Sequence, residues 1–437
     1  MTAKAGMSPA INSPPGTVES RKDRIALIVT YLNIVLYALC YQLQRPVEPF
    51  LVKSLSSQAA DPVEISRTYG NLQSFFNAVQ TVGSPLVGIL LDRIGIRYAS
   101  AVVFAATALS YFILAYATDM NLLFLSKVPT VLQAAFLVAQ ATASTATGGD
   151  AAARARALGR MTTMYTIGAT IGPALGGWLA DRGDLYFSAK IAVAGSLVSV
   201  VLSLMYLPDA HSTATQDTEK EKTVLSYSES LRHSLTIGLR SSVWPLLLVK
   251  LLGGVVASMH STALPLILTQ KVDFEASQLG ASMSASMFSV AIFAAVFMSP
   301  ITKLIGPDGM AKLGLAGRAL MAPAMAAIVS VATGNERSVV VQVATASVLH
   351  ALSAHSLATG LTTQTTGIVK KEEQGALLGL EHSLFSLARI AGPSIGTMLL
   401  ATSPDGNFWH VAICCALMDA ALLVFLLAQR NSKSKPF

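Results

Sequence analysis

Long apolar stretches alternate with short polar connections along almost the whole chain. A helix of about 20 residues crosses a hydrocarbon layer of roughly 30 Å, because each residue adds about 1.5 Å. Twelve runs have about that length, at approximately 25–44, 68–91, 99–117, 122–147, 159–180, 187–207, 244–268, 279–300, 311–332, 338–366, 375–401 and 408–428. The pattern predicts an all-α, multi-pass membrane protein with twelve transmembrane helices.

One polar connection, residues 208–243, is far longer than the others. It follows the sixth apolar run, so it divides the chain into two halves of six helices each. We expect five segments: a cytosolic tail (1–24), a six-helix bundle (25–207), a cytosolic linker (208–243), a second six-helix bundle (244–428) and a cytosolic tail (429–437). Part of the linker can form an amphipathic surface helix.

The charge of the chain agrees with this topology. Of its 437 residues only 13% are charged, about half the roughly 25% of soluble domains. The net charge of +7 would also suit a nucleic-acid-binding protein, so the placement of the basic residues decides. With the N-terminus inside, the cytosolic segments hold 21 Lys and Arg and the outer segments hold seven. This bias follows the positive-inside rule, and it excludes nucleic acid as the reason for the basic charge. Plasma and organelle membranes cannot be distinguished.

An internal repeat relates the two halves. Residues 158–177, LGRMTTMYTIGATIGPALGG, align without gaps on residues 378–397, LGLEHSLFSLARIAGPSIGT. The offset of 220 residues is about half the chain, so the fifth span pairs with the eleventh. Residues 44–51 and 260–267 pair less clearly and share a proline, at positions 49 and 265. Two tandem six-helix units are expected to produce this pattern.

Two motifs carry a resemblance to a known family. Residues 88–97, GILLDRIGIR, resemble the loop signature of the major facilitator superfamily and differ where Ile96 replaces a basic residue. The pattern G-x-x-x-G-P-x-x-G-G at 168–177 resembles the drug:proton antiporter branch. Several spans are similar to the organic-cation-transporter-like members of solute carrier family 22. The resemblance implies two pseudo-symmetric six-helix bundles and transport by alternating access.

The resemblance also implies a gate. Within residues 88–97 it assigns to Gly88, Asp92, Arg93, Gly95 and Arg97 a latch that favours the outward-facing conformation. The equivalent stretch in the second half, residues 296–306, has Lys303 in place of the aspartate, so the latch is expected to be asymmetric.

The small residues Gly172, Pro173 and Gly176 lie on one face of the fifth span. This face suits a bending point for alternating access, and it equally suits ordinary close helix packing. Both interpretations stay open.

Polar side chains recur with helical spacing in three spans of the first half. A buried amide in hydrocarbon needs a hydrogen-bonding partner or water, so these faces do not point at lipid. They predict a water-accessible cavity, with hydrogen bonding between helices as the alternative for any single residue. The candidates are Tyr37, Tyr41, Gln44, Asn77, Gln80, Gln133 and Gln140.

Ionisable residues gather in the spans of the second half, where they are functional candidates. His260, His350, Glu381 and Arg389 are expected to bind solute, and Glu381, His382 and His355 are candidates for carrying a coupling proton. Two lysines, Lys127 and Lys250, lie close enough to span ends for their amines to reach the interface. We expect Asp419 in the last span to be protonated or paired, without an assigned role.

Three functions are compatible with these features. The resemblance implies a secondary transporter of organic cations or amphiphilic drug-like compounds, in exchange for protons. Charge alone also admits an anionic or lipid-like metabolite, because Arg389 and Lys250 would repel a cation. A non-transporting membrane scaffold is the third.

We expect no enzyme, metal or cofactor. The pattern G-x-S-x-G at 392–396 lies in a membrane helix, where the turn of a nucleophile elbow cannot form. The expected partners are a small solute, protons and the bilayer, and a monomer suffices.

Overall fold

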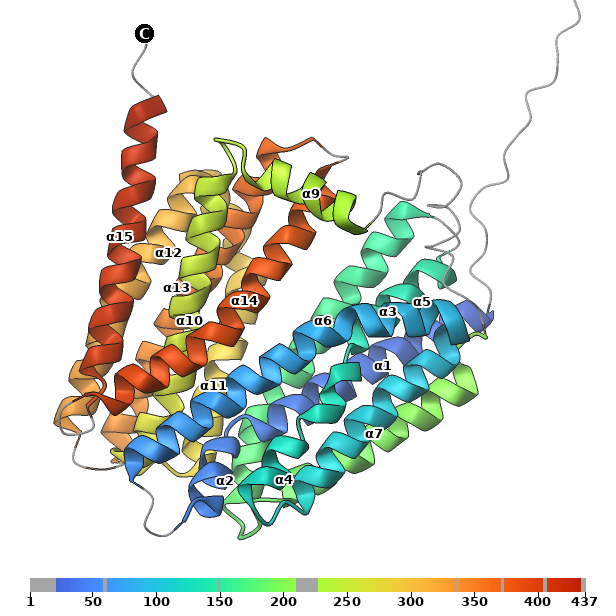
Figure 1. The fold of residues 1–437 in the computed structure, drawn as a ribbon, viewed down its shortest axis with the longest axis horizontal. Helices are drawn as coiled ribbons and strands as arrows, with labels where there is room; N and C mark the ends of the chain where they lie inside the picture. The colour runs from blue at the N-terminus through green and yellow to red at the C-terminus, as the bar shows by residue number, and fades with distance from the viewer. Residues whose placement is uncertain are drawn as a thin grey trace, which may run out of the picture.

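The computed structural model describes residues 21–57, 61–147, 150–209, 227–332, 334, 336–370, 373–403 and 407–433, and these contain helices and no strand. The helices form two groups (Figure 1). The first half contains α1 (Arg21–Gln44), α2 (Glu48–Leu55), α3 (Pro62–Ala115), α4 (Met120–Leu125), η1 (Val128–Leu132), α5 (Ala135–Ala146), α6 (Ala151–Ala180) and α7 (Phe187–Tyr206). The second half contains α9 (Tyr227–Gly238), α10 (Trp244–Gln270), α11 (Ala276–Ile292), η2 (Phe293–Phe297), α12 (Met298–Val331), α13 (Arg337–Ile368), α14 (Gln374–Ala401) and α15 (Trp409–Lys433).

The helices have the length and composition of membrane spans. In the described ranges, nine helical segments are long and apolar enough to cross a membrane. Two of them, Pro62–Ala115 and Ala276–Val331, contain 54 and 56 residues, which at 1.5 Å per residue is about 80 Å and enough to cross twice. Together with the 30-residue α6, this is consistent with the twelve expected spans.

Each of these two long segments is kinked at one glycine. Gly95 has φ 76° and ψ 172°, and Gly306 has φ 70° and ψ 170°. Such dihedrals are essentially restricted to glycine, because a Cβ would clash with the backbone. The two glycines are the last residues of the aligned stretches 88–95 and 299–306, so the backbone repeats here although the charges differ.

The fourth expected span is not one continuous helix. Residues 122–147 are divided into α4, the short 3₁₀ helix η1 and α5. Pro129 lies at the start of η1, and a proline cannot donate the backbone hydrogen bond that a continuous α-helix would need there. The expectation of an unbroken helix was therefore wrong, and the break positions Lys127 beside α3.

Glycines set the packing in both halves. A Cβ at Gly176 of α6 would overlap the carbonyl oxygen of Leu43 in α1, and one at Gly172 would lie 2.6 Å from Cβ of Gln42. In the second half, a Cβ at Gly396 of α14 would lie 2.7 Å from the carbonyl oxygen of Met259 in α10. The repeated glycines thus let α6 pack on α1 and α14 on α10, so close packing explains them and Pro173 sits inside an intact helix.

The two halves meet at the end of the molecule where α2 and α4 lie, which we call the α2 end (Figure 1). There Asp181 accepts hydrogen bonds from the backbone N–H groups of Ala276 and Ser277, at 3.1 and 2.9 Å. Ser74 and Ser394 bond at 2.8 Å, and a Cβ at Gly70 would overlap Thr397. At the opposite end, which we call the α9 end, α9 lies within the expected linker 208–243. Residues 210–226 of that linker lie outside the described residues.

Candidate functional site

A cavity of about 580 Å³ lies between the two halves. Its walls come from α1, α3 and α6 of the first half and from α10, α11, α13 and α14 of the second. Most of the lining is apolar or hydroxyl-bearing, with a few amide, aromatic and charged side chains. A cavity of this size that both halves build is the arrangement that a small organic solute requires.

The charged groups of this cavity are two arginines. Arg45, just past the end of α1, and Arg389 of α14 both line it, whereas its lining contains no aspartate or glutamate. Within the described part of the chain neither guanidinium forms an ion pair. Arg389 lies 5.9 Å from the ring centre of Phe385, which lines the same cavity. The electrostatic character of the cavity is therefore positive.

Two histidines form part of the cavity wall. His260 of α10 and His350 of α13 stack with their ring centres 3.9 Å apart and their planes 17° apart. His260 is 4% exposed, and the edge of Phe408 packs against it. The structure therefore brings together both histidines that the sequence placed in the solute site.

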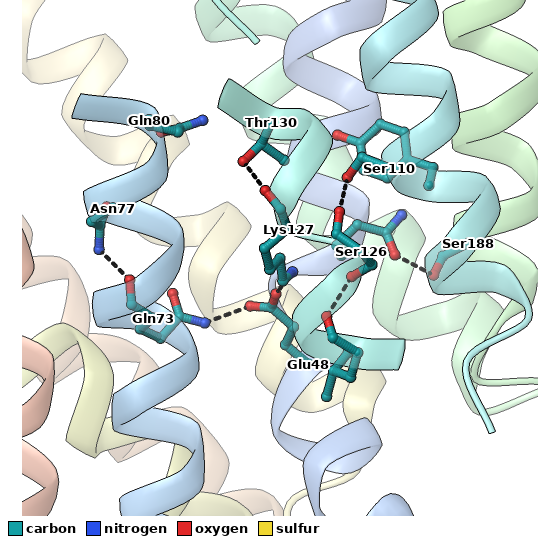
Figure 2. Close-up of polar contacts among 12 residues, drawn as sticks. Glu48, Gln73, Asn77, Gln80, Ser110, Ser126, Lys127, Thr130 and Ser188 are labelled. Atoms are coloured by element: carbon teal, nitrogen blue, oxygen red, sulfur yellow. Dashed lines mark hydrogen bonds and ion pairs between the residues drawn. The ribbon is translucent and has the colours of Figure 1, made fainter. Parts of the chain in front are cut away.

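A buried ion pair stands beside the cavity, between Glu48 at the start of α2 and Lys127 before η1 (Figure 2). Gln73 of α3 donates a 2.6 Å hydrogen bond to the second oxygen of Glu48. Lys127 is 7% exposed, so the expectation that its amine reaches the interface was wrong. A signal existed in the sequence: the expected topology puts Glu48 and Lys127 near the same membrane face.

The polar stripes of the first half divide between cavity and helix contacts. Tyr41 and Asn77 line the cavity, and the Asn77 amide also donates a 2.9 Å hydrogen bond to the backbone oxygen of Arg389. Tyr37 stacks on Tyr41, with ring centres 6.4 Å apart. Both interpretations of the stripes therefore hold, each for different residues.

The other amides lie outside the cavity. Gln80 donates to Gln133 at 3.1 Å, and Gln133 and Gln44 surround a small hollow next to Glu48. Gln140 is exposed and lies beside Gly88 and Asp92 toward the α9 end. In this conformation these four side chains do not line the central cavity.

The proton-coupling candidates of the second half lie away from the central cavity. Glu381 forms an ion pair with Lys250 at 2.5 Å. Both line a second cavity of about 470 Å³, together with His382, while His355 lies half-buried on α13. The two cavities share four wall residues: Gly254, Ala257, Ala354 and Phe385.

Asp419 is paired, as one of the two expectations had it. Its carboxylate lies 3.1 Å from Nε of Arg318, and both side chains are at most 2% exposed. Arg318 also donates to the backbone oxygen of Gly253 at 3.0 Å. The pair links α12 to α15 behind the cavity.

The gate motif engages its own half in this structure. Arg97 donates a 2.8 Å hydrogen bond to the backbone oxygen of Leu207, at the end of α7. Asp92 and Arg93 are exposed, and a Cβ at Gly88 would have no atom within 4 Å. The latch role that the resemblance assigns to this motif stays a prediction.

Comparison with known proteins gives a consistent result. The sequence matches the Major Facilitator Superfamily over residues 30–335 and 247–437. It is 25% identical to mouse solute carrier family 22 member 18, over 94% of this chain and 98% of that protein.

Two solved structures share the architecture. The nucleoside transporter NupG superposes with a TM-score of 0.70 at 13% identity, covering 94% of this chain and 99% of that one. The human organic anion transporter MFSD10 (TETRAN) superposes with a TM-score of 0.60 at 19% identity, covering 95% and 100%. The twelve-span periodicity of the chain, its two repeated helical halves and the cavity between them agree with the family match. The chain belongs to the Major Facilitator Superfamily.

Proposed function

We propose that the protein is a secondary transporter of amphiphilic organic anions, which it moves across the membrane by alternating access. The observation that carries this proposal is the charge of the central cavity. Arg45 and Arg389 line it, no carboxylate does, and neither arginine is paired within the described residues. A guanidinium remains charged at every physiological pH, so the cavity attracts an anion and repels a cation.

The remaining lining suits an amphiphilic solute. Apolar side chains such as Leu264, Leu268 and Met283 offer surface for a hydrophobic body, and the hydroxyls of Ser261 and Ser286 offer hydrogen bonds. The human structural relative named above is described as an organic anion transporter, which supports the same substrate class without assigning it.

The cation interpretation came from the family resemblance, and Glu381 was the one carboxylate among the candidates that could balance a cation. That carboxylate already has Lys250 as its partner at 2.5 Å, and it lies outside the central cavity. A cation entering the cavity would therefore meet aromatic rings and two arginines without a carboxylate to balance its charge. This makes organic cations the weaker candidate substrate.

A matched series of three probes tests the charge preference: naphthalene-1-sulfonate, naphthalene-1-sulfonamide and N,N,N-trimethyl-1-naphthylammonium. They share one ring system and differ in charge. We expect purified protein to bind the sulfonate most tightly and the ammonium least, as measured by calorimetry and by uptake into proteoliposomes.

Arg389→Gln and Arg45→Gln should each weaken sulfonate binding about tenfold or more, because each removes a charge-assisted hydrogen bond of about 1.5–3 kcal/mol. Arg67→Gln removes the same charge from an exposed position on α3 outside the cavity and should change binding less than twofold. Preferential binding of the ammonium probe would refute the anion proposal.

A further inference from the structure

The stacked pair His260–His350 has hydrogen-bonding atoms that nothing in the described chain satisfies. Both ring nitrogens of His260 and Nδ1 of His350 are buried without a partner among those residues. The rings lie face to face, and Phe408 closes one edge. Buried polar atoms without partners destabilise a fold, so packing alone does not explain why two imidazoles occupy this wall.

Both rings border the cavity in which the anion is proposed to bind. An imidazole is neutral or singly charged near neutral pH, and it changes between these forms with small changes in its surroundings. A bound anion would therefore find, next to it, the one type of side chain that can take up a proton in response.

The charged residues that line the cavity with this pair are two arginines, and a third arginine lies behind the rings with a carboxylate as its partner. Arg318 of α12 lies behind the rings, with its own charge matched by Asp419 of α15. Arg389 of α14 and Arg45 at the end of α1 share the cavity. From α11 the facing groups are Ser282, Met283 and Ser286, which do not titrate. Positive charge nearby opposes a proton on either ring, and an anion placed between the arginines and the rings removes that opposition.

We propose that His260 and His350 together form the proton-coupling site, taking up one proton when the substrate anion binds. This inference rests on the proposed function. Only one proton is expected for the pair, since two charged rings 3.9 Å apart would repel each other. A singly charged anion then travels with one proton, and the occupied cavity changes face without moving net charge.

This assignment differs from the candidates that the sequence offered. The charge of Glu381 is matched by Lys250, and His382 is exposed in the second cavity, so binding in the central cavity changes the surroundings of neither directly. His382→Gln therefore serves as a matched histidine control, and His233→Gln, on exposed α9, as a second one.

The test uses proteoliposomes that enclose a pH-sensitive dye, with naphthalene-1-sulfonate as the probe, because a sulfonate does not carry protons across lipid by itself. We expect the wild-type protein to move about one proton with each sulfonate. His260→Gln and His350→Gln should lower this ratio at least fivefold, whereas His382→Gln and His233→Gln should leave it unchanged. The ratio does not depend on how much protein is reconstituted.

Calorimetry in two buffers of different ionisation enthalpy covers variants that bind the sulfonate but no longer transport it. Wild-type protein should take up about one proton on binding, and the His260→Gln and His350→Gln variants much less than one. If a His→Gln variant binds no sulfonate, the His→Asn variant at the same position is used instead, because its amide can donate a hydrogen bond close to where the imidazole nitrogen was.

The outcomes separate the two proposals. If the wild-type protein binds and transports sulfonate without protons, or if the His260 and His350 variants keep the ratio, the coupling site is refuted and the anion transporter stands. A ratio that falls in His382→Gln alone would likewise refute it in favour of the second cavity. If the wild-type protein binds no sulfonate while binding the ammonium probe, both proposals fail.

Discussion

Helices α6 and α14 occupy corresponding places in the two halves, and each packs through glycines against the first long helix of its half. Their other faces differ. The aligned sequences place Met161 where the second half has Glu381, and the pairing of Pro49 with Pro265 places Ile34 opposite Lys250. Ile34 and Met161 belong to one hydrophobic cluster, each 1% exposed, while Lys250 and Glu381 form an ion pair.

The same structural position thus holds an apolar contact in one half and a salt bridge in the other. Close helix packing depends on the glycine face alone, so the adjacent face can change from apolar to charged without changing the fold. The charge of the second half is therefore available for function or for interaction with solutes. In the first half the buried charge, Glu48 with Lys127, lies instead at the α2 end, where the halves meet.

The largest change in stability is expected when the ion pair is replaced by the apolar residues of the first half. Glu381→Met alone should lower the free energy of unfolding by about 3 kcal/mol, because it leaves the Lys250 amine without its carboxylate in a mostly buried place. The double variant Lys250→Ile/Glu381→Met should recover most of this loss, as the Ile34–Met161 arrangement in the first half suggests. Unfolding in detergent, followed by heating or denaturant, measures both. A double variant less stable than the single one would contradict the equivalence of the two positions.

The shared kink gives a second, smaller test. Gly95→Ala and Gly306→Ala should each cost about 1–3 kcal/mol of unfolding free energy, because both glycines have dihedrals that side chains rarely adopt. Gly88→Ala lies in the same motif, where the new methyl group meets no atom within 4 Å, and should be neutral or stabilising. A large cost at only one of Gly95 and Gly306 would contradict the repeat of the kink, and a cost at Gly88 equal to theirs would show that the dihedrals are not its cause.

The smallest expected effect concerns α9, which has no counterpart among the described residues of the first half. Arg240, just after α9, forms two 2.7 Å hydrogen bonds with Glu373, and this partner lowers the pKa of the Glu373 carboxyl from 4.5 to about 2. Because the folded pKa is below the unfolded one, the attachment is complete above about pH 4.5 and is lost as the pH falls toward 2.

Hydrogen exchange of the α9 amides, corrected for the intrinsic effect of pH, measures this attachment. Glu373→Gln should raise α9 exchange modestly at pH 6 and leave little further dependence down to pH 3. Asp308→Asn, which weakens the partly buried pair with Lys312 on α12, serves as the control and should leave α9 exchange unchanged.

Much of the architecture could be predicted from the sequence. The lengths of the apolar runs placed the spans, and the repeated Gly-Pro-x-x-Gly stretches identified α6 and α14 as equivalent helices. Both signals are local: a span needs only enough consecutive apolar residues, and a packing face needs only small residues at helical spacing. The break at Pro129 was missed because hydropathy averages over a proline.

The site was predicted less well. The sequence identified Tyr41, Asn77, His260, His350 and Arg389 as cavity candidates, and the structure places all five in the lining of one cavity. It missed Arg45, and it favoured an interfacial position for the amine of Lys127, which is paired in the interior.

The amino-acid sequence by itself determined that the chain is a two-part helical membrane protein, since apolar length and small-residue spacing act within single helices. Only the tertiary structure decided which charges neutralise each other. Glu48 and Lys127 are 79 positions apart in the chain, and whether a buried charge is free or matched depends on which distant helix lies beside it. Arg45 and Arg389 line the cavity, and the proposed preference for an anionic solute rests on these two unpaired charges.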